Sequence, residues 1–237
     1  MEPSIAFFIA GIIGAVVGAV VVLQTSKIVG RWRPSIAPLE FLIVGHDDAG
    51  KTSFLNFLRH NEFADERMTR DTLEVSRQGA FQLVRPGEMD LPVKRILDIP
   101  GPLDPGEQLE LVRREAPRIL LIMVSADNPT SSRWLRDFAA GLRVLLSKDA
   151  RLADKLISIS VVLNKMDLIG EYACGERLAE MVKIVDTALE PLLMSNVRSI
   201  AVLPCTLLSG KGGEKAANRI LASIINAAKR NRRLVPK

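Results

Sequence analysis

The sequence predicts an α/β domain with a mostly parallel sheet of six strands and helices on both faces, preceded by one transmembrane helix. Short apolar runs alternate with amphipathic stretches from Leu39 to Arg230, which is typical of a parallel sheet covered by helices. Residues 4–26 contain no charged side chain, as expected of a segment that crosses a bilayer. Glycine-rich or charged turns follow several apolar runs, at the strand ends where open α/β sheets bind their ligands.

Composition fits a globular body and excludes several classes of protein. Of the 237 residues, 48% are apolar and 25% are charged, as in a chain with a packed core. The net charge of +5 is concentrated in residues 27–33 and 229–237, and the remainder is slightly acidic. We therefore expect no direct nucleic-acid partner. With only Cys174 and Cys205, neither a disulfide framework nor a structural zinc site is expected.

The uncharged N-terminal stretch is interpreted as a membrane anchor. As a helix, residues 4–26 would span about 35 Å, against a hydrocarbon core of about 30 Å. A signal peptide is the alternative, but it would begin with basic residues and have a shorter apolar run, whereas this segment follows Glu2. A buried core helix is a second alternative, although polar positions would then interrupt the apolar ones.

The charges around this segment predict its orientation and the domain boundaries. Lys27, Arg31 and Arg33 follow the span, so the body is expected on the cytoplasmic side of a single-pass membrane protein. The expected order is a transmembrane anchor at 1–26, a linker at 27–38, the domain at 39–230 and a basic tail at 231–237. The tail either binds anionic lipid or is a solvated helix end.

Each element of the body is predicted from its pattern. Strands are expected at 39–45, 81–84, 93–99, 118–126, 156–164 and 197–204, and helices at 50–60, 131–149, 176–193 and 213–230. The expected strand 118–126 contains an unbroken apolar run at 119–124, as in a strand covered on both faces. The turn-forming residues 85–90 predict a hairpin between the second and third strands. Phe54, Leu55 and Leu58 share one face of the first helix.

The stretch GHDDAGKTS, residues 45–53, matches a phosphate-binding P-loop. It has the spacing G-x-x-x-x-G-K-T, directly after an apolar strand and before a helix, which is the context that a P-loop requires. The glycines let backbone N–H groups wrap a phosphate chain, and Lys51 would meet the β- and γ-phosphates. The Thr52 hydroxyl is a candidate Mg²⁺ ligand. The candidate phosphate-binding residues are Gly45, Asp47, Asp48, Ala49, Gly50, Lys51, Thr52, Ser53 and Gly101.

Two later motifs indicate which nucleotide binds. Asp98 and Gly101 form D-x-x-G at the end of an apolar strand, where the carboxylate can reach Mg²⁺ through a water and the glycine amide can reach the γ-phosphate. Asn164, Lys165 and Asp167 form N-K-x-D at the end of another strand. An aspartate there can accept both N1–H and the exocyclic amine of guanine, and adenine offers neither donor at those positions. The expected ligands are therefore GTP, GDP and Mg²⁺, in a P-loop NTPase fold.

With these motifs, residues 39–230 resemble a small GTPase of the Ras-like superfamily. The P-loop and the stretch 145–168 are similar to the ADP-ribosylation-factor branch and its relative, the beta subunit of the signal-recognition-particle receptor. The D-I-P-G motif and the N-terminal span lean toward the latter. A myristoyl anchor as in the factors would need glycine after the initiator methionine, and this chain has Glu2 there.

The resemblance implies further site residues. A switch I threonine meets Mg²⁺ in this family, and Thr69 is similar to it in spacing, with Thr72 as the alternative. The last base-contact loop resembles P-C-T at 204–206, which would bring Cys205 and Thr206 near the guanine oxygen. Cys205 could equally be a plain small apolar residue at a strand end.

The sequence departs from the family at the water-orienting position. Many members have glutamine directly after the D-x-x-G glycine, whereas this chain has Pro102. Glu107 and Gln108 come later and are expected in the next helix, and His46 is expected to be structural or solvent-facing, not a general base. Slow intrinsic hydrolysis follows, and no catalytic residue is identified.

Two functions remain open. One is a membrane-anchored GTP/GDP switch that recruits or regulates a cytosolic protein through residues 62–76 and 101–112. The other is a GTP-loaded docking module that hardly hydrolyses its nucleotide. The resemblance implies protein targeting at the endoplasmic reticulum if the source is eukaryotic.

Overall fold

The computed structural model describes residues 39–60, 63, 76–78, 81–83, 91–98, 103–169, 171–194, 197, 199–207 and 211–230. The predicted membrane span at 1–26, the linker at 27–38 and the basic tail at 231–237 lie outside the described residues. Among the helices that are described, none is both long enough and apolar enough to cross a membrane.

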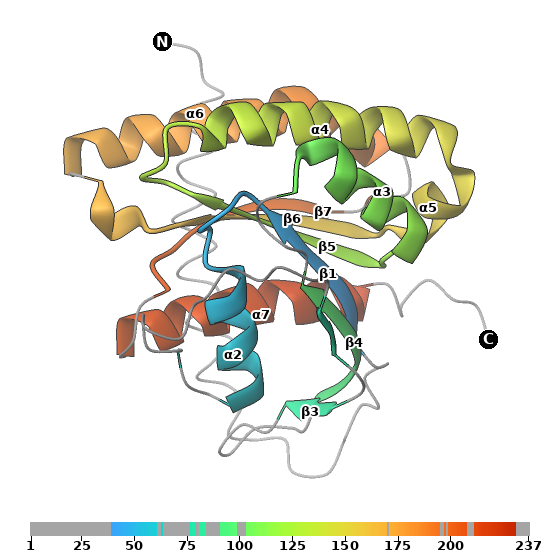
Figure 1. Ribbon diagram of the computed structural model, residues 1–237, viewed down its shortest axis with the longest axis horizontal. Coiled ribbons are helices and arrows are strands. Elements are labelled where there is room, and N and C mark those ends of the chain that lie inside the picture. Colours follow the sequence, from blue (N-terminus) through green and yellow to red (C-terminus); the bar gives the residue numbers. More distant parts are fainter. Residues whose placement is uncertain are drawn as a thin grey trace. The chain divides into compact units, whose positions relative to one another are not determined.

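The body is a sheet with helices on both faces, as predicted (Figure 1). Five strands run parallel in the order β4, β1, β5, β6, β7. Their bounds are β1 Leu39–Gly45, β4 Leu91–Asp98, β5 Ile119–Ser125, β6 Ser158–Asn164 and β7 Ser199–Pro204. The central strands β5 and β6 are buried along their whole lengths, which explains their continuous apolar sequences.

The sheet has seven strands within the described residues, and not the predicted six. The additional strand is β2 (Ser76–Gln78), which pairs with β4 antiparallel beside β3 (Phe81–Leu83). Both short strands keep one register along β4, from Ser76 opposite Asp98 to Leu83 opposite Leu91. The predicted hairpin between β3 and β4 is present. β2 was missed because three polar residues carry no apolar alternation.

Four helices agree with the predicted ranges apart from their ends, and the structure adds α3 and α5, for which no range was predicted. The α-helices are α2 Lys51–His60, α3 Pro105–Glu115, α4 Ser131–Lys148, α5 Ala150–Lys155, α6 Glu171–Leu189 and α7 Lys211–Arg230. The short helix α5 follows α4 after one residue, Asp149, whose side chain caps it by accepting from Leu152 N. Helix α6 begins five residues before the predicted start at 176.

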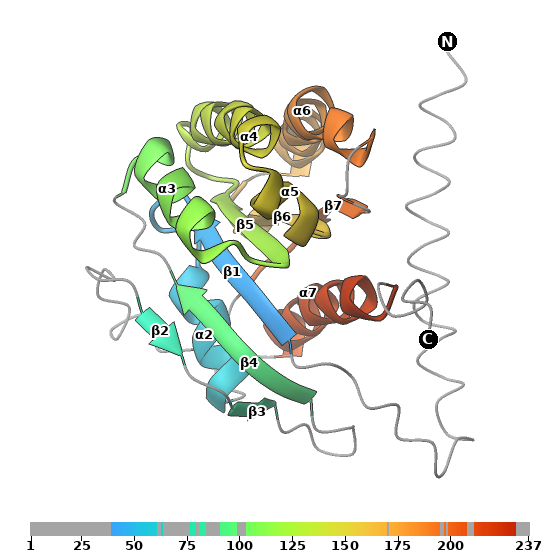
Figure 2. The same cartoon turned by 90° about the vertical axis from the view of Figure 1, so that its right-hand side faces the viewer.

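Two cores lie on the two faces of the sheet (Figure 2). Leu42 and Val44 of β1 pack with α3, α4, α5 and α6, whereas Phe41 and Ile43 pack with α2 and α7. This alternation follows from the strand geometry, in which successive side chains point to opposite faces. Helices on both faces fix the carboxyl ends of the parallel strands at one edge of the sheet.

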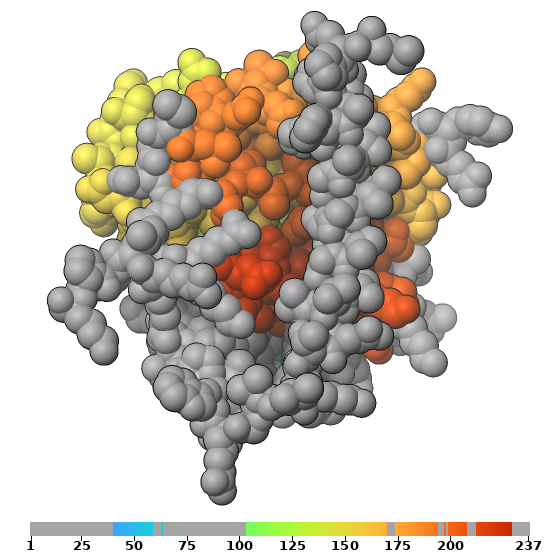
Figure 3. All heavy atoms as spheres, turned by 180° about the vertical axis from the view of Figure 1, so that it is seen from behind, coloured from blue at the N-terminus to red at the C-terminus, as the bar shows by residue number. Residues whose placement is uncertain are grey.

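Strand β7 forms one edge of the sheet, and all six of its residues are partly exposed. Helices α6 and α7 flank it on the two faces, and Figure 3 shows the side from which α6 (orange) and α7 (red) are both visible. The loop that follows β7 carries Cys205 and Thr206. It therefore lies beside the end of β6, where the N-K-x-D motif begins.

Helix α3 has a strong start. The Asp104 carboxylate accepts from the Glu107 amide at 2.8 Å, and the Glu107 carboxylate accepts from the Asp104 amide at 3.1 Å. Pro105 occupies the first turn, where its missing N–H costs nothing. Such a capping box contributes about 1 kcal/mol to helix stability. The predicted placement of Glu107 and Gln108 in the next helix is confirmed.

Candidate functional site

The GHDDAGKTS stretch forms a loop between the end of β1 and the start of α2. A Cβ added at Gly45 would lie 1.9 Å from the Met123 carbonyl oxygen, and one at Gly50 would lie 2.4 Å from the Asn164 amide nitrogen. Gly50 also has a φ of +84°, which other residues rarely adopt. Both glycines of the motif are therefore required by the space around the loop.

Lys51 begins α2 and turns back into the loop. Its side chain is buried, and Nζ donates to the Gly45 carbonyl at 3.2 Å and to the His46 carbonyl at 2.9 Å. A buried ammonium is stable only with such partners. The loop thus holds a positive charge at the N-terminal end of a helix, where the free N–H groups also favour an anion.

Asn164, at the end of β6, connects this loop to the loop after β7. Its amide nitrogen donates to the Ala49 carbonyl at 3.1 Å, and its oxygen accepts from the Leu207 amide at 2.9 Å. The Cys205 thiol lies 3.7 Å from the same oxygen. Because Asn164 is only 2% exposed, these hydrogen bonds determine how the two loops sit against each other.

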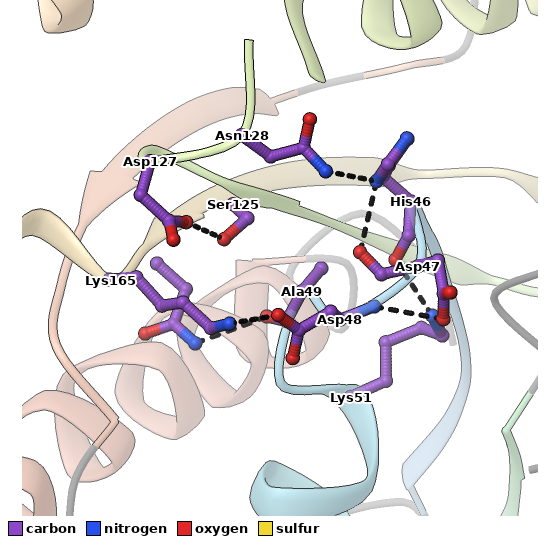
Figure 4. Close-up of polar contacts among 10 residues, drawn as sticks. His46, Asp47, Asp48, Ala49, Lys51, Ser125, Asp127, Asn128 and Lys165 are labelled. Atoms are coloured by element: carbon purple, nitrogen blue, oxygen red, sulfur yellow. Dashed lines mark hydrogen bonds and ion pairs between the residues drawn. The ribbon is translucent and has the colours of Figure 1, made fainter. Parts of the chain in front are cut away.

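Lys165 forms an ion pair with Asp48 across the loop, as Figure 4 shows. Both residues have a left-handed backbone, with φ values of +61° and +56°. Lys165 therefore contacts the phosphate loop through the Asp48 carboxylate. The Asp48 side chain is 79% exposed, so the ion pair is partly screened and contributes less than a buried one.

Asp167 is exposed and lies in the short 3₁₀ helix Met166–Leu168. The preceding residue, Met166, donates its amide to the Cys205 carbonyl at 3.3 Å. On the far side of the same loop, Arg219 of α7 donates to the Pro204 carbonyl at 2.6 Å. The structure therefore brings together the predicted base-contact residues that follow β6 and β7. The carboxylate of Asp167 is exposed beside them.

Cys205 is buried and chemically quiet. Burial raises the pKa of its thiol to about 12, with Arg219 lowering it and Asp167 raising it further. The thiol is therefore neutral at physiological pH, and Cys205 is a small apolar residue of the core around α2 and α7. Thr206 beside it is partly exposed.

His46 is held by residues that the sequence reading did not connect to the loop. Its Nδ1 lies 2.9 Å from the Asp47 carbonyl oxygen, and its Nε2 lies 3.0 Å from the Thr130 hydroxyl. The ring also meets the Trp134 ring edge-on, with centroids 6.2 Å apart. These contacts agree with the expected structural role of His46 and not with a general base.

Arg177 of α6 fixes the neighbouring loop after β5. Its guanidinium donates to the Ala126 carbonyl at 3.1 Å and to the Asn128 carbonyl at 2.7 Å, and pairs with Glu180 at 2.6 Å. Hydrogen bonding from Ser132, followed by Arg177, lowers the pKa of Glu180. No motif marks Arg177 in the sequence, because its partners are backbone groups about 50 residues earlier in the chain.

Gln108 of α3 was also missed as a partner of the loop. The residue is fully buried, and its side-chain amide contacts both the N–H and the C=O of Gly45. One signal was available in the sequence. Gln108 and Val112, four residues apart, are the two buried positions of α3, so a polar amide interrupts the apolar stripe of the helix.

Several predicted residues are described only in part or not at all. The backbone of Asp98 ends β4 opposite Ile43, two residues before Gly45, at the expected edge of the sheet. Thr69, Thr72, Gly101 and Pro102 lie outside the described residues. Within the described part, no group of three or more His, Cys, Asp or Glu side chains could hold a metal ion by itself.

No protein-family model matches the sequence, and no curated protein sequence matches it either. Among solved structures, the fold is similar to a chain of the signal recognition particle receptor SRb-GTP/SRX complex from Chaetomium thermophilum. The TM-score is 0.51 at 15% sequence identity, over 78% of this chain and 98% of that one. At this identity the likeness shows the fold alone, a mostly parallel sheet with helices on both faces.

Proposed function

We propose that the chain binds GTP and GDP and acts as a membrane-anchored switch that recruits or regulates a cytosolic protein. One observation carries this proposal. The phosphate-loop motif and the N-K-x-D motif, more than 100 residues apart, are joined directly by the Asn164–Ala49 hydrogen bond and the Lys165–Asp48 ion pair. A phosphate cradle fused to a guanine-recognition motif favours a guanine nucleotide over other phosphate ligands.

In this proposal the loop holds the phosphates. The amides of residues 47–53 and of Gly101 donate to phosphate oxygens, and the buried Lys51 ammonium neutralises their charge. Lys51 exchanges its two carbonyl contacts for the β- and γ-phosphates. The helix α2 adds the favourable field of its N-terminus.

The base lies against the loops after β6 and β7. Asp167 accepts from N1–H and the exocyclic amine of guanine, and the exposed carboxylate is available for this role. Lys165 lies along the base, and the backbone at Cys205 and Thr206 faces the guanine oxygen. An adenine base would leave the Asp167 carboxylate without a matching donor, at a cost of several kcal/mol in discrimination.

Mg²⁺ fits the donor set, which is made of hydroxyl and carboxylate oxygens. Thr52 supplies a hydroxyl from the first turn of α2, Asp98 acts through a water, and Thr69 or Thr72 supplies the switch I ligand. When bound, the ion would neutralise charge on the β- and γ-phosphates. The end of β4 beside β1 supports the placement of Asp98 at this edge of the sheet.

The alternative function is a GTP-loaded docking module that hardly hydrolyses. Pro102 stands at the position of the usual glutamine. Glu107 is engaged in the capping box, and the Gln108 amide is engaged with Gly45 and Leu103. Neither side chain is placed to orient a water in this arrangement, which supports slow hydrolysis.

We place the anchor in residues 1–26 and the body on the cytoplasmic side. The solved relative is described as a complex of SRb-GTP with SRX. By analogy, a cytosolic protein would bind through residues 62–76 and 101–112. In a eukaryotic source, the corresponding role is protein targeting at the endoplasmic reticulum. The anchor is tested by expressing the chain in cells and extracting the membrane fraction. We expect detergent to release the protein and alkaline carbonate to leave it in the membrane.

Single-turnover hydrolysis separates the two functions. The full-length chain in detergent is loaded with γ-labelled GTP, and phosphate release is followed after Mg²⁺ is added, with the Lys51→Ala variant as a blank. Release within minutes would identify a self-sufficient switch. Release over hours or slower would identify a GTP-held docking platform, and a sample that retains no guanine nucleotide would contradict both.

A further inference from the structure

Strand β1 continues beyond its pairing with β4. The last pair with β4 joins Ile43 to Asp98, whereas the pairing with β5 extends to Gly45 opposite Met123. Along a strand, the N–H and C=O of one residue point to the same neighbour, and those of the next residue point to the opposite neighbour. His46 donates its amide to Met123, on the β5 side. The N–H and C=O of Gly45 therefore face the side on which β4 has already ended.

Gln108 occupies that position with its side chain. Its Oε1 accepts from the Gly45 amide at 3.0 Å, and its Nε2 donates to the Gly45 carbonyl at 3.1 Å. The same nitrogen donates to the Leu103 carbonyl at 3.1 Å. A primary amide offers one acceptor and two donors, and this geometry uses all three. Gln108 thus replaces the missing strand partner at Gly45, the first residue of the loop.

The contact also affects Lys51. The Gly45 carbonyl accepts from Lys51 Nζ as well as from Gln108 Nε2, and a carbonyl oxygen has two lone pairs for such donors. When Lys51 turns toward phosphate, the Gly45 carbonyl keeps Gln108 as a donor. The Gly45 carbonyl is then paired both with and without a ligand, so the turn of Lys51 does not leave this buried acceptor unpaired.

The helix that carries Gln108 is well anchored. The capping box of Asp104 and Glu107 fixes the first turn of α3, and Val112 one turn later is buried in the core with α4 and β5. Leu103, the second partner of the amide, lies directly before Asp104. The side chain therefore links the phosphate loop to the chain segment that follows the D-x-x-G motif.

We propose that Gln108 is a positioning residue of the nucleotide site. It pairs both backbone polar groups of Gly45, the first residue of the phosphate loop, and couples this loop to the segment after D-x-x-G. It acts on bound nucleotide through the backbone and Lys51 and contacts no ligand itself. The inference deepens the proposed function and rests on it, since it names a residue that regulates how firmly the same site holds its nucleotide.

The test is the release rate of a fluorescent GDP and a fluorescent GTP from the full-length chain in detergent. Gln108→Leu keeps the size of the side chain and removes its hydrogen bonds. We expect release of both nucleotides to accelerate by at least about tenfold, the factor that corresponds to 1.4 kcal/mol. General destabilisation can also accelerate release through opening of the site, so the variant is compared with a destabilised control.

Ser158→Ala provides the matched control. Ser158 is 3% exposed and accepts a hydrogen bond from the Ser199 hydroxyl at 2.8 Å, at the opposite end of the sheet from the loop. Its loss is expected to lower the unfolding free energy while leaving nucleotide release unchanged. Equal acceleration in Gln108→Leu and Ser158→Ala would overturn the proposal, because the effect would then be general destabilisation.

The variant Gln108→Glu tests the donor role of the side chain while its size stays the same. An ionised carboxylate can accept from Gly45 N but cannot donate to either carbonyl, whereas a protonated carboxyl recovers one donor. Because position 108 is fully buried, burial is expected to raise the pKa of the introduced carboxyl. The ratio of its release rate to that of the wild type is therefore expected to rise between about pH 6 and about pH 8, as the carboxyl ionises. A ratio of one across this range would contradict the proposed donor role.

Hydrogen exchange of the nucleotide-free chain keeps the inference testable apart from the function. In Gln108→Leu, the peptide that contains Gly45 is expected to lose protection, with no such loss in Ser158→Ala. If the wild type bound no guanine nucleotide, the proposed function would fail while the loss of protection still reported the Gln108–Gly45 contact. Unchanged protection together with unchanged release would overturn the inference alone.

Discussion

The phosphate loop is held by two amide side chains, one on each side, and the two differ in what they connect. On the base side, Asn164 of β6 contacts Ala49 and reaches the loop after β7. On the other side, Gln108 of α3 contacts Gly45 and reaches Leu103. Both side chains are buried, and each both donates to and accepts from backbone groups.

This difference indicates that the two sides of the phosphate loop have different roles in nucleotide binding. The Asn164 side is held by several elements. The ends of β5, β6 and β7 meet there, and α2 and α7 pack against the same core. The Gln108 side connects the loop to the chain after D-x-x-G, which is the segment that changes with the γ-phosphate in the proposed function. We infer that the base side determines which nucleotide binds, and the α3 side determines how long it stays.

The largest effect is expected from the residue that both sides surround. Lys51→Ala removes the buried ammonium that holds the loop carbonyls. We predict that GDP and GTP affinities fall by at least about a thousandfold, or about 4 kcal/mol, because the phosphates lose their charge-assisted partner. Isothermal titration of the full-length chain checks this, and an unchanged affinity would mean that this loop does not bind the phosphates.

The base side is tested for specificity by Asp167→Asn. The amide offers a donor where guanine also offers one, so GTP binding is expected to weaken by about a hundredfold while xanthosine triphosphate binds better. Competition of the two nucleotides for a fluorescent GDP measures the change. Retained guanine preference would remove the N-K-x-D assignment and with it the distinction between the two sides.

Asn164→Ala sharpens the comparison with Gln108→Leu. The substitution removes the hydrogen bonds to Ala49 and Leu207, and an increase of about tenfold in the dissociation constant is expected from their loss. Unlike Gln108→Leu, it is expected to weaken guanine more than it weakens inorganic triphosphate, since it disorganises the base loops. Equal losses for both ligands would show that the two amides have the same role.

The smallest effect is expected at the outer edge of the base side. Arg219 is exposed, and its guanidinium supports the loop after β7 through the Pro204 carbonyl at 2.6 Å. Arg219→Ala should accelerate GDP release by only about two- to threefold, because water can replace an exposed donor. A change of tenfold or more would show that this loop is held mainly from α7.

Much of the fold was predictable because its signals are local. The apolar runs of β1, β5 and β6 and the periodic face of α7 follow from burial. The two short antiparallel strands could not be counted from sequence, since β2 is three polar residues whose pairing depends on β4. Helix α5 was missed for a similar reason, because six residues are too few to show a helical period.

In the candidate site, too, the residues with local sequence signals were predicted and those without them were not. Gly45, Gly50, Lys51 and Asn164 were identified because their motifs require fixed spacings within one loop. Gln108 and Arg177 were not, because each acts on backbone groups that are distant in the sequence. A backbone partner leaves no residue type to recognise. Such contacts become visible only when the tertiary structure brings an amide or a guanidinium to an unpaired peptide.

The central claim, that the site recognises guanine nucleotides, is tested most directly by competition. A fluorescent GDP bound to the full-length chain is displaced with GDP, ADP and inorganic pyrophosphate in parallel, with Asp167→Asn as the control. We expect GDP to displace it at a concentration at least about a hundredfold lower than ADP does, and we expect this gap to close in the variant. Equal displacement by GDP and ADP in the wild type would contradict the account.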